Sequence, residues 1–189
     1  MTNTFDLESE IELAYNWAKE MLEDTGEFMP SFIAWPKDEE GRMLFTTPWS
    51  DEQSKEEMVR LIKMIFMVYN IERYMLVSEV WTVEAKDKCK LLPSERDDKK
   101  ECLGITYVDE TQSKMFAWPI IRNGAGKPSL GEKISYDKGA GRMSELLPPI
   151  DCPVCPKEAR EHMIRVIQEQ AGLKLHKLED LAPNKETWL

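Results

Sequence analysis

Apolar residues recur at three- and four-residue spacing in two early segments, which predicts two amphipathic helices. Residues 6–25 predict the first helix, and Gly26 is placed to end it in a left-handed C-cap. In the second helix we expect Ser50 at the N-cap, with Gln53 completing a capping box. The apolar faces consist of Leu7, Ile11, Ala14, Ala18, Met21 and Leu22 in the first helix, and of Met58, Leu61, Ile62, Ile65 and Tyr69 in the second.

Extended segments follow each of these helices. Residues 27–36 and 42–49 predict two strands joined by a polar loop that closes at Gly41. Residues 73–86 form the strongest strand pattern, with apolar side chains on both faces, so we expect this strand to be covered from both sides. Residues 101–108 and 113–121 predict two further strands, joined by a turn at 109–112.

Glycine and proline dominate residues 122–156, which predicts a long loop without regular structure. Residues 157–171 predict a last helix that ends before Gly172, and residues 172–189 form a short tail. A chain of 189 residues suits one domain over residues 1–189, with an α+β core at 6–121.

The order of elements is helix, two strands, helix, three strands, helix. Strands joined by short loops pair as antiparallel neighbours, so we expect an α+β fold: a five-stranded antiparallel sheet with helices packed on it. Over residues 6–171 this order resembles the profilin-like, Roadblock-type arrangement, and the resemblance implies that the last strand is central. Pro119 counts against that position, because proline removes a hydrogen-bond donor from the sheet.

A second resemblance rests on residues. The stretch LVSEVWTV (76–83), followed by PSERDDKKECLGI (93–105), is similar to a family of uncharacterised small bacterial and phage proteins. In that family a strand ends in Val-Ser-Glu-Ala-Trp, and a Pro-Ser element with Asp-Arg-x-Glu precedes the next strand. Here Val80 replaces the alanine, and residues 98–101 (DKKE) replace the second element. The resemblance covers residues 74–105 and implies no activity.

Composition narrows the class of protein. Hydrophobic residues make up 42% of the chain and charged residues 32%, as in ordinary folded soluble proteins. No apolar run approaches the roughly eighteen residues that span a bilayer, and the acidic residues 1–12 lack the features of a signal peptide. We therefore expect a cytoplasmic protein with no membrane partner, in which cysteines remain thiols.

The formal net charge of −10 is unevenly distributed. Residues 1–121 contain 14 lysines and arginines against 25 aspartates and glutamates. An acidic body of this kind repels a phosphate backbone, so general nucleic-acid binding is disfavoured.

Cys152 and Cys155 form a Cys-x-x-Cys pair just before the last predicted helix. Together with Cys89 and Cys102 they would supply the four thiolates of a zinc site if the fold brought all four together. A redox pair is a second alternative, although no strand leads into this helix as in thioredoxin-type proteins. The favoured interpretation has no cofactor. In it the cysteine pair belongs to a rigid, proline-framed segment before the helix, and Pro156 begins the helix at a position where a missing N–H loses no hydrogen bond.

The locally basic segment 122–142 is a candidate ligand site. Its five basic residues are Arg122, Lys127, Lys133, Lys138 and Arg142. A glycine-rich loop with this charge suits an anionic small molecule or partner, and the alternative is a solvated surface loop.

Three residues are candidates for catalysis. Glu84 and Lys86 have the Glu-x-Lys form of PD-(D/E)xK nucleases, in which the carboxylate binds Mg²⁺ and the lysine orients water. Such nucleases also need an acidic residue on the preceding, adjacent strand. Here a helix precedes the strand, which argues against that chemistry. Glu79 lies on a largely apolar strand face, where an unpaired carboxylate is costly. We expect a structural partner for it, namely Arg73, Arg96 or a backbone donor, with general-base catalysis as the alternative.

Four tryptophans fall on predicted strands or their ends: Trp35, Trp49, Trp81 and Trp118. They form a core layer or leave an aromatic patch for a partner.

From these features we expect a non-enzymatic interaction or regulatory protein that binds a protein partner or forms a homodimer. One alternative is a hydrolase acting on a phosphate-bearing small molecule through Glu79, Glu84 and Lys86. Another is a module that sequesters an anionic ligand without turnover.

Overall fold

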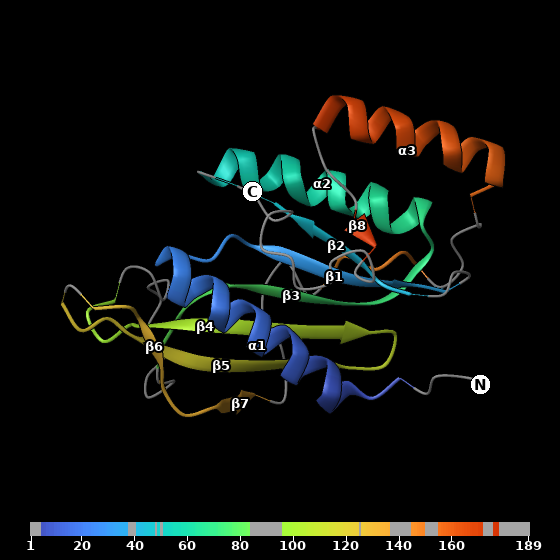
Figure 1. Ribbon diagram of the computed structural model, residues 1–189. Helices are drawn as coiled ribbons and strands as arrows, with labels where there is room; N and C mark the ends of the chain where they lie inside the picture. The colour runs from blue at the N-terminus through green and yellow to red at the C-terminus, as the bar shows by residue number, and fades with distance from the viewer. Residues whose placement is uncertain are drawn as a thin grey trace.

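The computed structural model (Figure 1) describes residues 5–37, 41–47, 49, 51–83, 96–124, 126–136, 145–149, 155–171 and 176–177. In these residues the helices are α1 (Leu7–Thr25), α2 (Glu52–Val68) and α3 (Lys157–Ala171). The longer strands are β1 (Ser31–Pro36), β2 (Met43–Thr46), β3 (Ile71–Thr82), β4 (Lys100–Asp109) and β5 (Ser113–Ile121). The short strands are β6 (Ser129–Leu130), β7 (Ile134–Tyr136) and β8 (His176–Lys177).

The strands form one open antiparallel sheet in the order β6-β5-β4-β3-β1-β2-β8, and β7 also pairs with β5. The prediction of an α+β fold with helices on an antiparallel sheet is confirmed, but the five expected strands are too few. The strand order also differs from the profilin-like expectation of a central last strand. In the described sheet β3 lies between β1 and β4, and β5 lies outside β4.

Pro119 explains part of this placement. The backbone N–H of Gly131 donates to the carbonyl oxygen of Pro119 at 2.8 Å, so the polar groups of Pro119 point away from β4. The missing N–H of Pro119 is therefore on the outer side of β5, where it removes no bond from the β4–β5 ladder.

The short strands correct the sequence-based prediction of an unstructured loop at 122–156. Both β6 and β7 lie in this segment and pair with β5, while β8 of the C-terminal tail pairs with β2. Segments of two or three residues show no alternation that a sequence pattern can reveal. They form because the outer edges of β5 and β2 carry backbone donors and acceptors that need partners.

Two hydrophobic cores lie on opposite faces of the sheet. Helix α1 covers one face, α2 covers the other, and α3 packs outside α2 (Figure 1). Strand β3 contributes Met75 and Val77 to the α1 core and Tyr74 and Leu76 to the α2 core. The expectation that this strand is covered from both sides is confirmed.

Two helix ends can be compared with their predictions. Gly26 has φ 83° and its N–H donates to the carbonyl oxygen of Leu22, so α1 ends in the predicted left-handed cap. Helix α2 begins one residue later than expected, with Asp51 as N-cap and Ser54 as its capping-box partner. The Asp51 carboxylate accepts from the Ser54 N–H at 2.7 Å, while the predicted cap Ser50 lies outside the described residues.

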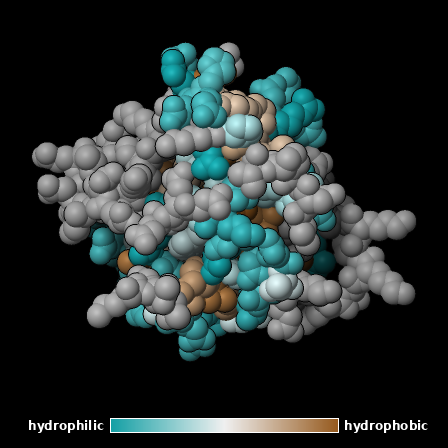
Figure 2. All heavy atoms as spheres, turned by 90° about the vertical axis from the view of Figure 1, so that its right-hand side faces the viewer, coloured by the Kyte–Doolittle hydropathy of each residue, from teal (hydrophilic) through white to brown (hydrophobic). Residues whose placement is uncertain are grey.

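Among the residues that the structure describes, the surface at one end of the sheet is mostly polar. Figure 2 shows the end that carries the turn between β4 and β5, with small hydrophobic patches among hydrophilic residues. In the described part of the chain, no helix has both the length and the apolar composition needed to cross a membrane.

Gly104 allows close contact between β4 and β3. A Cβ at this position would lie 2.8 Å from Cγ2 and 3.2 Å from Cγ1 of Val80, a β-branched side chain with little rotameric freedom. We expect Gly104→Ala to lower the free energy of unfolding by about 1–3 kcal/mol, measured by urea denaturation. The cost should fall to less than half in a Val80→Ala background. An equal cost in both backgrounds would contradict this explanation.

Candidate functional site

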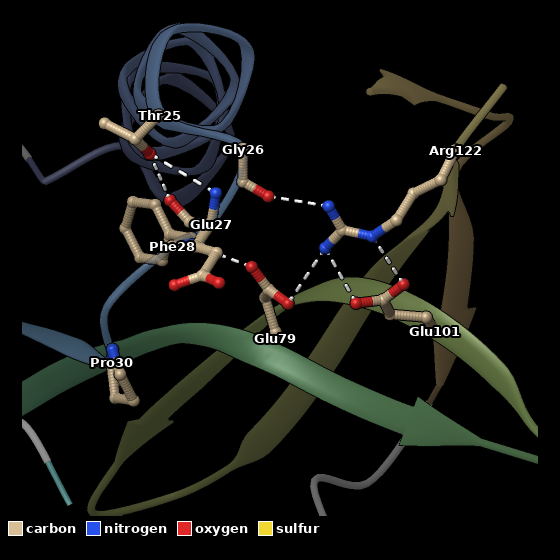
Figure 3. A pocket seen from close by; sticks show the side chains of 8 residues that line it. All are labelled: Thr25, Gly26, Glu27, Phe28, Pro30, Glu79, Glu101 and Arg122. Carbon is tan, nitrogen blue, oxygen red and sulfur yellow. Dashed lines mark hydrogen bonds and ion pairs between the residues drawn. The ribbon is translucent and has the colours of Figure 1, made fainter. Parts of the chain in front are cut away.

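An open cleft of about 590 Å³ lies where the end of α1 meets the sheet. It is lined by residues 25–28 and Pro30, by Glu79 on β3, by Glu101 on β4 and by Arg122 directly after β5 (Figure 3). Four elements that are distant in the sequence thus contribute to one concave surface.

Strand register brings the two strand-borne glutamates together. In the β3–β4 ladder Glu79 is opposite Leu103, and Trp81 is opposite Glu101. Residues two apart on a strand share a face, so Glu79 and Glu101 are diagonal neighbours on one side of the sheet. Leu103 belongs to the core beneath α1, which shows that this is the face on which α1 packs.

Arg122 contacts both glutamates and the end of α1. Its Nε and Nη2 donate to the two carboxylate oxygens of Glu101 at 2.9 and 2.8 Å, which is a bidentate pair. Nη2 also donates to Glu79 Oε2 at 3.3 Å, and Nη1 donates to the carbonyl oxygen of Gly26 at 2.6 Å. One guanidinium therefore holds β3, β4 and the C-terminal end of α1 in a fixed arrangement (Figure 3).

The two glutamates have different electrostatic surroundings. Burial raises the pKa of Glu79, and the neighbouring Glu101 adds to the rise although the Phe28 N–H donates to Glu79 Oε1 at 2.7 Å. The hydrogen bonds from Arg122 lower the pKa of Glu101. Glu79 is therefore the carboxyl of the pair that binds a proton more readily.

The partners expected for Glu79 are confirmed only in part. The backbone donor exists and is the Phe28 N–H, but Arg73 and Arg96 pair with Glu72 and Asp98 instead. The charged partner is Arg122, a residue of the segment predicted to bind an anion. Glu101 was missed, because its position beside Glu79 depends on the β3–β4 register.

The basic residues of the 122–142 segment contact separate parts of the protein. Apart from Arg122, Lys127 Nζ lies 3.5 Å from Asp24 Oδ1, and Lys133 Nζ lies 4.6 Å from the centroid of the Phe116 ring. Lys138 and Arg142 lie outside the described residues. An anionic ligand at this segment stays a prediction.

The cysteine and Glu-x-Lys candidates are described only in part. Cys102 is buried, with its Sγ 3.2 Å from Thr82 Oγ1, and burial raises the pKa of its thiol. Cys155 is half-buried just before α3. Cys89, Cys152, Glu84 and Lys86 lie outside the described residues. Among the residues that are described, no group of three or more histidine, cysteine or acidic side chains is arranged to hold a metal ion. Zinc binding therefore stays untested.

One tryptophan of the predicted aromatic set lies exposed beside the cleft. Trp118 is buried, and Trp35 and Trp49 pack against the two cores, whereas Trp81 is 45% exposed. Trp81 shares a face of β3 with Glu79 and is directly opposite Glu101. Lys99 Nζ lies over its ring, 4.8 Å from the centroid. An exposed aromatic ring therefore neighbours the charged residues of the cleft on the same face of the sheet.

Comparisons of the chain with protein-family models, with curated proteins and with solved structures found no match. The resemblance to the Val-Ser-Glu-Ala-Trp family stays a prediction, although its motif residues 77–81 lie on β3 and one of them, Glu79, lines the cleft. Function has to be inferred from the chemistry of the site.

The Arg122 contacts predict a specific change in titration. We expect Arg122→Gln to raise the pKa of both Glu79 and Glu101, because the guanidinium lowers both values in the wild-type chain. Carboxyl carbon NMR shifts followed from acid to neutral pH measure the two values. The exposed Arg60 of α2 provides the control, since Arg60→Gln should change the pKa of neither glutamate. Unchanged values in Arg122→Gln would show that the pairing is absent in solution.

Proposed function

We propose that the protein is a non-enzymatic protein-interaction module whose binding site is the cleft surface. This name refers to Glu27, Phe28, Glu79, Trp81, Glu101 and Arg122. The observation that supports the proposal is the half-exposed Trp81 beside an open cleft with a charged centre. Tryptophan and arginine are enriched at the energetic centres of protein interfaces.

The contacts within the cleft favour binding over catalysis. The Phe28 N–H and the charge of Arg122 both favour the ionised form of Glu79, which weakens this carboxylate as a base. The hydroxyl in the lining, that of Thr25, donates to the carbonyl oxygen of Met21 at 2.8 Å. These groups already satisfy one another, as expected of a surface that presents fixed charges.

One observation favours an enzyme as the second candidate. Neighbouring carboxyls whose pKa values move apart serve as acid and base in hydrolases, and Glu79 and Glu101 have this property. Hydrolysis of nucleotides or phosphate monoesters by the purified chain, lost in Glu79→Gln, would favour the hydrolase over the interaction module.

The interaction proposal predicts binders that depend on Trp81. Peptides selected from a random library on the wild-type chain should bind Trp81→Ala roughly tenfold more weakly or worse, as for a hot-spot residue. Affinity is measured by fluorescence anisotropy.

Met64 of α2 is a matched control, because it is also 45% exposed and belongs to the helix on the opposite face of the sheet. Met64→Ala should leave the same affinities unchanged, and thermal unfolding checks that both variants fold. Binders whose affinity does not change in Trp81→Ala, or falls equally in both variants, would count against the cleft surface as the binding site. Sedimentation of the wild-type chain and Trp81→Ala tests the predicted homodimer, in which the partner is a second copy.

A further inference from the structure

The charge of the cleft surface limits what it can bind. Among the described residues that line the cleft, three glutamates face one arginine: Glu27, Glu79 and Glu101 against Arg122. Arg122 is already paired with two of these carboxylates. The surface therefore retains an excess of negative charge, which opposes an anion and attracts a cation.

The end of helix α1 adds to this preference. Its C-terminal residues and Gly26 lie at the cleft, and the Gly26 carbonyl oxygen accepts from Arg122 Nη1. The last carbonyl groups of a helix carry the negative end of its dipole and stabilise positive charge nearby.

Trp81 gives an independent indication of the same ligand chemistry. The face of an indole ring attracts cations more strongly than other aromatic side chains do. In the structure this ring already has the ammonium group of Lys99 over it, yet it remains 45% exposed. An exposed aromatic ring beside carboxylates suits a ligand that has both a positive charge and an apolar stem.

The charge of the whole chain agrees with the local pattern. Residues 1–121 hold every member of the cleft surface except Arg122, and acidic residues outnumber basic ones there by 25 to 14. A field of this sign accelerates the encounter with a basic partner and disfavours an acidic one.

We propose that the cleft surface binds an arginine side chain in a basic segment of a partner protein. The guanidinium would lie beside Glu79, Glu101 and Glu27, with its aliphatic stem against Trp81. Arginine is preferred to lysine because its planar fork forms bidentate pairs with carboxylates, as Arg122 does with Glu101. This inference rests on the proposed function, since it names the partner chemistry of the same site.

Four matched peptides test the proposal against the full chain. The first is a short Gly-Ser peptide with two arginines, and the others carry lysine, citrulline or glutamate at the same places. Citrulline has nearly the shape of arginine without its charge. By calorimetry at low salt, we expect the arginine peptide to bind at least about tenfold more tightly than the citrulline peptide, and the glutamate peptide to show no binding.

Variants of the cleft surface locate the binding. Glu101→Gln, Glu27→Gln and Trp81→Ala should each weaken the arginine peptide several-fold, whereas Glu158→Gln on the exposed face of α3 should not. Thermal unfolding of each variant is measured to check that it folds. Where Glu101→Gln fails to fold, Glu27→Gln and Trp81→Ala decide the result.

Equal affinity for the arginine and citrulline peptides would overturn the proposal, as would binding that all cleft variants leave unchanged. Tighter binding of the lysine peptide would overturn the preference for a guanidinium. If library-selected binders still depend on Trp81 in any of these cases, the interaction function stands and only its partner chemistry is wrong. If neither the library nor the peptides yield Trp81-dependent binding, both proposals fail.

Discussion

A single guanidinium connects the parts of the fold that form the cleft. Arg122 follows β5 and contacts Glu101 on β4, Glu79 on β3 and the last turn of α1 at Gly26. Without it, two neighbouring carboxylates would repel each other on a partly buried sheet face. Its side chain is 39% exposed, and ion pairs at such exposure add little to stability because water and salt screen them. The main effect of Arg122 is therefore to position the glutamates.

The cleft exists because α1 stops before it has covered its whole face of the sheet. The helix packs on β3, β4 and β5 through a stripe of small and branched side chains, and Gly26 ends it in a left-handed cap. Beyond this point Glu79 and Glu101 line the open cleft (Figure 3). The position of one glycine thus determines where core packing ends and the cleft begins.

Local sequence patterns predicted the elements well, because helix periodicity and strand composition act over short distances. The three helices, the five longer strands and the cap at Gly26 could all be predicted in this way. The need of Glu79 for a partner could also be predicted from its apolar neighbours. Its charged partner could not, because Arg122 is 43 residues away in the sequence. Only the register of the sheet brings that pair, and Glu101 beside it, into contact. The short strands were missed because their formation depends on the edges they cover.

The cleft is acidic, although the segment that supplies its arginine is basic. From sequence, the basic residues after position 121 suggested an anion, but the first of them, Arg122, is neutralised by glutamates and leaves an acidic cleft. The most direct test uses the Phe28 N–H, which donates to Glu79 and so reports on its surroundings. In amide and indole NMR spectra, addition of N-acetyl-arginine methylamide should shift the Phe28 amide and the Trp81 indole signals, while the citrulline analogue should not. Identical shifts with both compounds, or shifts confined to α2 and α3, would contradict a cation-binding cleft.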